Sequence, residues 1–120
     1  MQSLYKTEVF ITFRASFHYD VKPEWEKDIR EGRKTIDVRI NAQPYADVNK
    51  GDVIRYRSVK AKVKKIRAYP GLSDLLAHED YRKIVPEAKN HQEALQSLLE
   101  EITHMEPPHG ILAFEIESVK

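Results

Sequence analysis

Hydrophobic and polar residues alternate along several short stretches of the chain, and such alternation is typical of β-strands with one buried face. The pattern predicts strands at residues 7–13, 16–21, 32–40, 53–57, 59–64 and 111–117. The first two are rich in β-branched and aromatic residues, and they could also form one strand broken near residues 14–15. Alternation is strict over residues 59–64, but Ile66 falls out of phase, which predicts a β-bulge near Lys64 and Lys65.

A short helix is predicted directly before the strand at 32–40. Pro23 suits the first position of a helix, where its missing N–H would have no partner. Trp25 and Ile29 lie four residues apart and therefore share one face of this helix. Gly32 is the expected terminator, because glycine readily adopts the left-handed conformation that ends many helices. Packing of Trp25 and Ile29 must hold so short a helix in place.

Helical patterns return in the region 72–106. Ser73 can cap a short helix that carries Leu75 and Leu76, and a further helical turn is expected before Pro86.

A longer helix is expected to open at Asn90, with Glu93 three residues further on in a capping arrangement. Its apolar residues have helical spacing: Leu95, Leu98, Leu99 and Ile102. The helix should end near Met105, because the prolines at 107–108 cannot continue it.

Together these elements predict an α+β fold in a single domain over residues 1–120. The short connections between strands favour a mixed, mostly antiparallel sheet that curls into a small barrel, with helices flanking it. In this arrangement residues 1–15 add an N-terminal strand, and residues 72–106 form a helical insertion before the last strand. One domain is expected, because a chain of 120 residues can bury about 65% of its unfolded surface.

The strand at 32–40 has two unlike faces. Its apolar residues all point to one side and can pack into a core: Ile36, Val38 and Ile40. The other side sets Asp37 two residues from Arg39, with Lys34 near the start of the strand. These are the chemical groups of a small polar pocket, although an ordinary surface strand with an exposed ion pair has the same pattern.

The loop at residues 41–50, which carries Tyr45, can cover such a pocket, although most loops of this length merely connect strands. The candidate ligand-binding residues are therefore Lys34, Asp37, Arg39 and Tyr45. If the protein is an enzyme, the candidate catalytic residues are Lys34, Asp37 and Glu87, because burial and nearby charges can tune their pKa values for acid–base chemistry. Such clusters are more often structural ion networks.

The net charge of +1 is unevenly distributed along the chain. Residues 50–67 carry eight basic side chains against one acidic, whereas residues 72–106 carry eight acidic against three basic. The basic block predicts contact with a nucleic-acid backbone through Arg55, Arg57, Lys60, Lys62 and Lys64. Lysines that protect an edge strand from aggregation produce the same pattern. The acidic helical side, with Glu100 and Glu101, offers a third interpretation as a protein-interaction surface.

Composition narrows the possible chemistry. The absence of cysteine excludes disulfides, thiolate catalysis and cysteine metal sites. The five histidines lack the spacing of a metal site and the four glycines form no phosphate-binding loop, so we expect no metal and no cofactor. No apolar run approaches the ~20 residues that cross a bilayer, and the N-terminus lacks the apolar core of a secretion signal. We therefore expect a cytoplasmic protein with no membrane partner.

Three segments of the chain, taken in order, resemble the ASCH domain family. The most specific lies within residues 25–39 and contains the pattern Gly-x-Lys-x-x-(acid or Thr)-x-Arg at Gly32, Lys34, Asp37 and Arg39. The Gly-Asp turn at residues 50–54 and the last strand at residues 110–116 follow. The resemblance covers roughly residues 17–117, with residues 72–106 matching the variable helical insertion of the family.

This resemblance implies a PUA-like β-barrel with a cleft beside the first helix and a role with RNA or nucleotides. Lys34, Asp37 and Arg39 map to the cleft positions of the motif. One branch of the family hydrolyses the amide of acylated cytidine nucleosides with a lysine, a threonine nucleophile and a glutamate. This chain has Asp37 at the threonine position, and Glu87 is the candidate match for the glutamate. Two hypotheses follow: a domain that binds RNA or a nucleotide-like ligand, or a hydrolase acting on a modified nucleoside or on RNA.

Overall fold

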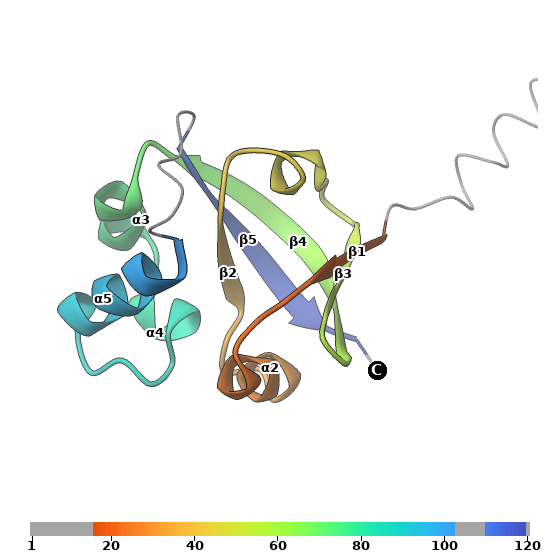
Figure 1. Ribbon diagram of the computed structural model, residues 1–120, viewed down its shortest axis with the longest axis horizontal. Coiled ribbons are helices and arrows are strands. Elements are labelled where there is room, and N and C mark those ends of the chain that lie inside the picture. Colours follow the sequence, from red (N-terminus) through yellow and green to blue (C-terminus); the bar gives the residue numbers. More distant parts are fainter. Residues whose placement is uncertain (1–15, 103–109, 120) are drawn as a thin grey trace, which may run out of the picture.

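The computed structural model describes residues 16–102 and 110–119, and within them five strands form one curled sheet. The strands are β1 (Ser16–Tyr19), β2 (Ile36–Ile40), β3 (Val53–Tyr56), β4 (Val59–Tyr69) and β5 (Ile111–Ser118). Their spatial order is β1-β3-β4-β5-β2, and all neighbours pair antiparallel except β1 with β3. The sheet curls into a half-barrel with β1 and β2 at its two edges (Figure 1). The predicted α+β class and mostly antiparallel curled sheet are confirmed. The strand expected at 7–13 lies outside the described residues.

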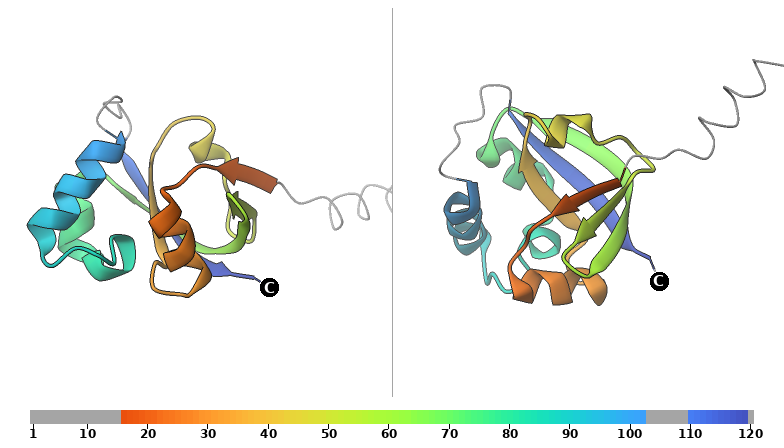
Figure 2. Two further views of the ribbon diagram at one scale, coloured as in Figure 1. Left: turned by 60° about the horizontal axis from the view of Figure 1, so that its bottom comes forward. Right: turned by 45° about the vertical axis from the view of Figure 1, so that its right-hand side comes forward.

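The helices gather mainly beside β2. They are α2 (Pro23–Arg30), α3 (Leu72–His78), α4 (Tyr81–Ile84) and α5 (His91–Ile102), and a single 3₁₀ turn, η1, spans Tyr45–Asp47. Helices α3, α4 and α5 connect β4 to β5 and lie together on the side of β2, while α2 lies at one end of the curled sheet (Figures 1 and 2). Among the described residues, none of these helices is both long and apolar enough to cross a membrane.

Helix α2 follows the prediction closely. Pro23 occupies its first turn, and the helix buries Trp25 and Ile29. Gly32, two residues beyond the last helical residue, has a φ of +80°. This is the left-handed conformation expected of a glycine at the end of a helix. The chain can therefore reverse direction sharply between α2 and β2.

Strand β4 shows the predicted alternation and the predicted bulge. Val59, Ala61 and Val63 are buried, while the intervening lysines are exposed. The pairing of β4 with β5 shifts register between Val63 and Lys65, because one extra residue of β4 enters the ladder there. The strand continues to Tyr69, five residues beyond its predicted end.

The helical region between β4 and β5 agrees with the prediction except at its first cap. Gly71, not Ser73, occupies the N-cap of α3, and Ser73 falls within the first turn because the helix already begins at Leu72. The Asn90 side chain accepts a hydrogen bond from the backbone N–H of Glu93 at 2.9 Å, as a helix cap does. Leu98 is buried, but Leu99 is 38% exposed. The end of the helix predicted near Met105 lies outside the described residues.

Both faces of β2 are buried, so its polar residues lie inside the molecule rather than at its surface. Its apolar side chains are all buried: Ile36, Val38 and Ile40. On the opposite face, Asp37 points into the interior of the curled sheet, where it meets Tyr56 of β3. Strands β2 and β3 are separated by two other strands in the sheet, so this contact crosses the interior.

Candidate functional site

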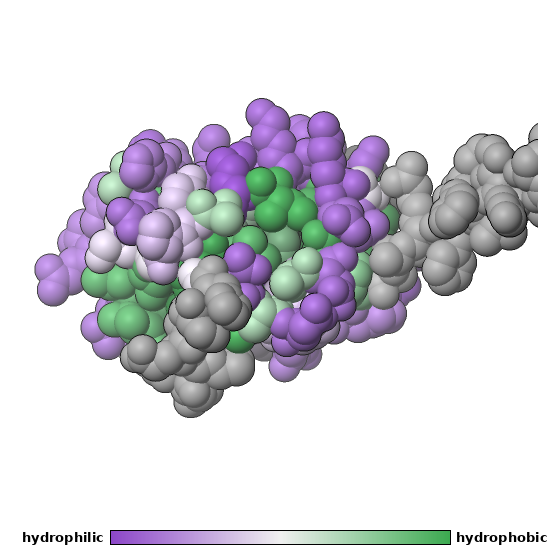
Figure 3. Space-filling view, turned by 90° about the horizontal axis from the view of Figure 1, so that it is seen from above, coloured by the Kyte–Doolittle hydropathy of each residue, from purple (hydrophilic) through white to green (hydrophobic). Residues whose placement is uncertain are grey.

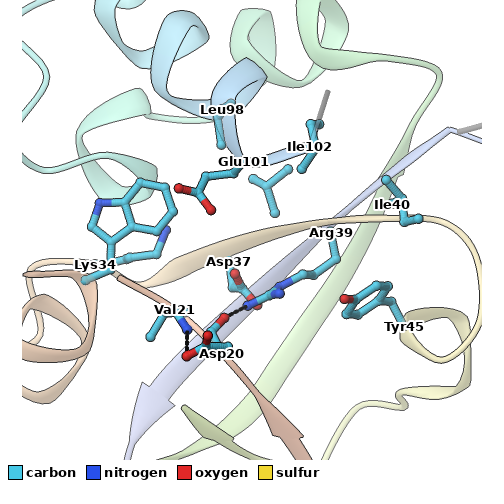
Figure 4. Close-up of a pocket in the computed structure, with 12 residues that line it drawn as sticks. Asp20, Val21, Lys34, Asp37, Arg39, Ile40, Tyr45, Leu98, Glu101 and Ile102 are labelled. Atoms are coloured by element: carbon cyan, nitrogen blue, oxygen red, sulfur yellow. Dashed lines mark hydrogen bonds and ion pairs between the residues drawn. The ribbon is translucent and has the colours of Figure 1, made fainter. Parts of the chain in front are cut away.

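A small cleft opens where the two edge strands of the half-barrel face each other. The cavity has a volume of about 70 Å³, within about 540 Å³ of empty space that includes its opening to solvent. Its walls come from the β1–α2 connection, β2, η1 and the last turn of α5. The lining residues are Asp20, Val21, Trp25, Lys34, Asp37, Val38, Arg39, Ile40, Tyr45, Leu98, Glu101 and Ile102. Figure 4 shows Leu98, Glu101 and Ile102 of α5 projecting toward Asp37 and Arg39 of β2.

Asp37 is the buried carboxylate of this cleft and is only 3% exposed. One carboxylate oxygen, Oδ2, accepts hydrogen bonds from Tyr56 Oη at 2.7 Å and from Arg39 Nε at 2.9 Å. Within residues 16–102 and 110–119, no donor is bonded to the other oxygen, Oδ1. Asp37 is therefore held in place through one oxygen and keeps the second available as an acceptor.

Arg39 lies beside Asp37 and is surrounded by aromatic rings. Its guanidinium also donates to the backbone carbonyl of Asp20 at 3.1 Å. The guanidinium carbon lies 5.0 Å from the ring centre of Tyr19 and 5.4 Å from that of Tyr45, within range of cation–π attraction. Burial alone would lower the pKa of the Arg39 guanidinium. The charge of Asp37 and its hydrogen bond to Arg39 act in the opposite direction, and the pKa is raised above its ordinary value. Arg39 is thus a cation fixed at the cleft.

Lys34 is only 1% exposed, and its ammonium is held by backbone carbonyls rather than by a carboxylate. Nζ donates to the carbonyl of Ile36 at 2.9 Å and to the carbonyl of Ile84 at the end of α4. It also lies 4.4 Å from the ring centre of Trp25. Burial lowers the pKa of Lys34 to about 8, although the nearby Asp37 opposes this shift. A fraction of Lys34 is therefore uncharged near neutral pH.

Glu87 lies close to this cleft but does not line it. Its carboxylate accepts hydrogen bonds from Trp25 Nε1 at 3.0 and 3.2 Å, so it contacts the tryptophan rather than Lys34 or Asp37. The structure thus brings Lys34 and Asp37 to one cavity and places Glu87 on the indole that forms part of the wall.

An ion pair connects α5, which lines the cleft, to the chain just before α2. Lys22, just before α2, pairs with Glu101 of α5 at 3.4 Å, and its Nζ lies 4.6 Å from the ring centre of Trp25. Glu101, which the third interpretation assigns to a protein-interaction surface, also lines the cleft. Hydrophobic residues gather at the centre of the face that carries η1, with hydrophilic residues around them (Figure 3).

The basic residues of β3 and β4 lie on a different surface. Lys60, Lys62 and Lys64 are exposed on the outer side of β4, the central strand of the sheet, whereas the cleft lies between its two edges. Arg55 of β3 is paired in register with Lys60. Arg57 instead follows β3 in a turn and forms ion pairs with Asp20 at 3.4 Å and Glu26 at 3.5 Å. Lys60 and Lys62 therefore lie apart from the cleft, whereas Arg57 pairs with Asp20 of the cleft wall, and Lys64 lines a second cavity together with Lys34.

Several residues of the site were not predicted. Asp20, Trp25 and Glu101 line the cavity, and Tyr56 fixes Asp37. The alternation of β3 places Tyr56 on the buried face, so its burial could have been predicted from the sequence. Its contact with Asp37 could not, because Asp37 lies across the half-barrel on β2.

Comparisons with known proteins support the fold but add no function. No protein-family model matches the chain, and no curated protein matches it. The crystal structure of hypothetical protein PH0355 is 25% identical, with a TM-score of 0.81, and the match covers 88% of this chain and 100% of that one. The solution NMR structure of protein PF0455 from Pyrococcus furiosus is also 25% identical, with a TM-score of 0.74, and covers 88% of this chain and 99% of that one. The half-barrel with its helices is thus similar to solved structures over nearly their whole length.

Proposed function

We propose that the protein binds a nucleotide-like ligand, free or as part of RNA, in the cleft between β1 and β2. The observation that carries this proposal is the pair of buried charges at one small cavity. Asp37 offers there a carboxylate oxygen that has no donor among the described residues, and Lys34 brings an ammonium to the same wall. A nucleobase presents N–H donors and carbonyl acceptors side by side on one edge. Such an edge can donate to Asp37 and accept from Lys34.

The remaining groups of the cleft suit the rest of such a ligand. Tyr45 is half-buried and supplies an aromatic ring at the wall, on which a base can stack with about 1–3 kcal/mol. Arg39 retains its charge beside it and can bind a phosphate or a carbonyl oxygen. The resemblance to the ASCH family, at Lys34, Asp37 and Arg39, supports the same ligand class.

Fluorescence of Trp25 provides a direct test, because it is the only tryptophan of the chain and forms part of the cavity wall. The protein should be titrated with the four common ribonucleoside monophosphates, the matching nucleosides and ribose 5-phosphate. We expect at least one nucleotide or nucleoside to change the emission in a saturable manner, and ribose 5-phosphate alone to bind more weakly.

Matched variants locate the binding site. Asp37→Asn keeps the shape of the side chain but removes its charge, and we expect it to weaken binding at least tenfold. Tyr45→Leu removes the aromatic ring of the loop and leaves Asp37 and Lys34 in place. Lys62→Ala, on the outer side of β4, serves as the control and should bind normally. If no nucleotide or nucleoside binds at millimolar concentration by fluorescence or calorimetry, the proposal is wrong.

Binding as part of RNA makes a further prediction about the lysines of β4. None of Lys60, Lys62 and Lys64 forms an ion pair with another described residue, so all three ammonium groups are free to contact phosphates. Each phosphate contact on a single strand contributes about −0.7 to the slope of log affinity against log salt. Replacing the three lysines by alanine should therefore flatten that slope by about 2. An unchanged slope would reject this face as an RNA contact.

A second candidate, a hydrolase acting on a modified nucleoside, is favoured by Lys34 alone. A lysine with a pKa of about 8 beside a carboxylate is partly neutral at pH 7 and can accept a proton from a reacting group. To test this candidate, the protein is incubated with an acylated cytidine, and the release of free cytidine is measured by chromatography. We expect Lys34→Ala to abolish the release with the fold intact. Wild-type protein that releases nothing excludes this candidate while leaving ligand binding unaffected. The predicted cytoplasmic location and a protein partner for the acidic side remain predictions.

A further inference from the structure

The hydroxyl of Tyr19 is buried behind the cleft without a hydrogen-bond partner. Tyr19 is 8% exposed, and in the part of the chain that the structure describes its Oη is the one side-chain oxygen or nitrogen that is both closed off from solvent and without a partner. Removing a hydroxyl from water without giving it a partner opposes folding. Buried groups of this kind are rare in folded proteins and are often explained by a functional role.

Its surroundings place Tyr19 directly behind two residues of the cavity wall. The ring of Tyr45 meets the ring of Tyr19 edge-on, with 4.9 Å between their centres. The guanidinium of Arg39 lies over the ring of Tyr19. Tyr45 and Arg39 line the cavity themselves. Tyr45 is only half-buried, sits on a single 3₁₀ turn and lies between the cavity and the ring of Tyr19, so it is the wall residue whose displacement would expose Tyr19 to the cavity.

We propose that Tyr19 is a ligand-binding residue of the inner cleft, whose hydroxyl donates a hydrogen bond to an acceptor oxygen of the ligand once Tyr45 moves aside. This inference rests on the proposed function and defines its chemistry further. Burial raises the pKa of Tyr19 to about 12, so the hydroxyl keeps its proton and is a donor over the physiological range. Arg39 has further N–H groups beside it, so the two residues together favour an oxygen acceptor, either a base carbonyl or a phosphate oxygen.

Tyr19→Phe separates this role from a purely structural one, because the two roles predict opposite changes in stability. A phenylalanine keeps the ring between Tyr45 and Arg39 and removes only the unpaired hydroxyl. We expect the variant to unfold at the same or a higher urea concentration than wild type, and to bind the nucleotide or nucleoside that wild type binds at least tenfold more weakly. Tyr81→Phe is the matched control, because its hydroxyl bonds the carbonyl of Lys89 and neither residue lines the cleft. Its affinity should equal that of wild type.

Each outcome of this experiment decides the inference. A loss of stability in Tyr19→Phe shows that the hydroxyl is already paired in the free protein, through water, and overturns the inference. Unchanged affinity in Tyr19→Phe overturns it as well, yet leaves the proposed function standing because wild type still binds. If wild type binds none of the probes, both the proposed function and the inference about Tyr19 are wrong. If Tyr19→Phe binds both the nucleoside and the monophosphate more weakly, the oxygen that accepts the Tyr19 hydrogen bond belongs to the nucleoside. If the variant binds only the monophosphate more weakly, that oxygen belongs to the phosphate.

Discussion

The buried ammonium of Lys34 makes the stability of the protein depend on pH in an unusual direction. Burial lowers its pKa from 10.5 to about 8 in the folded protein, while in the unfolded chain the lysine is exposed and keeps its ordinary value. Between these two values the unfolded chain holds a proton that the folded protein has lost. The free energy of unfolding must therefore rise with pH in this window. Below about pH 8 the full cost of the buried charge is present, and it is relieved as the pH approaches 10.5.

The size of the effect follows from the same two values. The shift is about 2.5 pKa units, or roughly 3 kcal/mol at full extent, since one unit corresponds to about 1.4 kcal/mol. Between about pH 7 and pH 9.5 the expected gain is about 2 kcal/mol, because the unfolded lysine is still mostly protonated at the upper limit. Burial raises the pKa of Tyr19 to about 12 and that of Tyr56 well above 10, which opposes the gain at higher pH. The measurement should therefore stop at about pH 9.5.

Urea unfolding followed by Trp25 fluorescence measures this gain directly. The comparison variant is Lys34→Met, which has a similar length and no charge. We expect wild type to gain about 2 kcal/mol over the window and Lys34→Met to gain almost nothing. Lys62→Met is the control, because Lys62 is exposed on the outer side of β4, so the gain of this variant should equal that of wild type. Equal gains in wild type and Lys34→Met, or a loss of stability in wild type, would refute the reasoning.

Two further predictions concern the scaffold of the cleft. Gly110→Ala should destabilise the protein by about 3 kcal/mol or more, because the φ of Gly110 is +96° and a Cβ would lie 2.4 Å from the carbonyl oxygen of Tyr69. Gly32 has a φ of +80° but lies in open space, so Gly32→Ala should cost only about 1 kcal/mol. Both losses are measured by the same urea assay. Equal losses would contradict the steric argument. Tyr56→Phe should cost about 2 kcal/mol, because it leaves the buried Asp37 without one of its two donors, while Tyr81→Phe at the surface should cost less than about 1 kcal/mol. If the two tyrosine variants lose the same amount, Tyr56 does not stabilise Asp37 as described.

Local patterns in the sequence were sufficient to predict much of this fold. The end of α2 at Gly32 and the bulge of β4 near Lys65 depend on residues that are close together in the chain, so the pattern reveals them. The same holds for Asp37 and Arg39, which lie two residues apart on one side of a strand and form an ion pair. Ser73 was misassigned because a glycine two residues earlier already begins the helix.

Long-range contacts could not be predicted in this way. Lys34 owes its burial in part to the carbonyl of Ile84, fifty residues further along the chain, and Asp37 owes its orientation to Tyr56. The separation of Lys60 and Lys62 from the cleft follows only from the strand order, which places β4 at the centre of the sheet and the cleft at its edges. A pattern of residues along the chain contains no information about which strands become edges.

That strand order also constrains how the protein can be made. Strand β5 is the last in sequence, yet it lies between β2 and β4 and is the only described link of β2 to the sheet. During synthesis, β2 therefore waits for more than seventy residues before its pairing partner leaves the ribosome. Until then, Asp37 and Lys34 have no completed interior to occupy. The cleft therefore cannot form before β5 has left the ribosome, and a nascent chain stalled before β5 would present an unpaired β2 to chaperones.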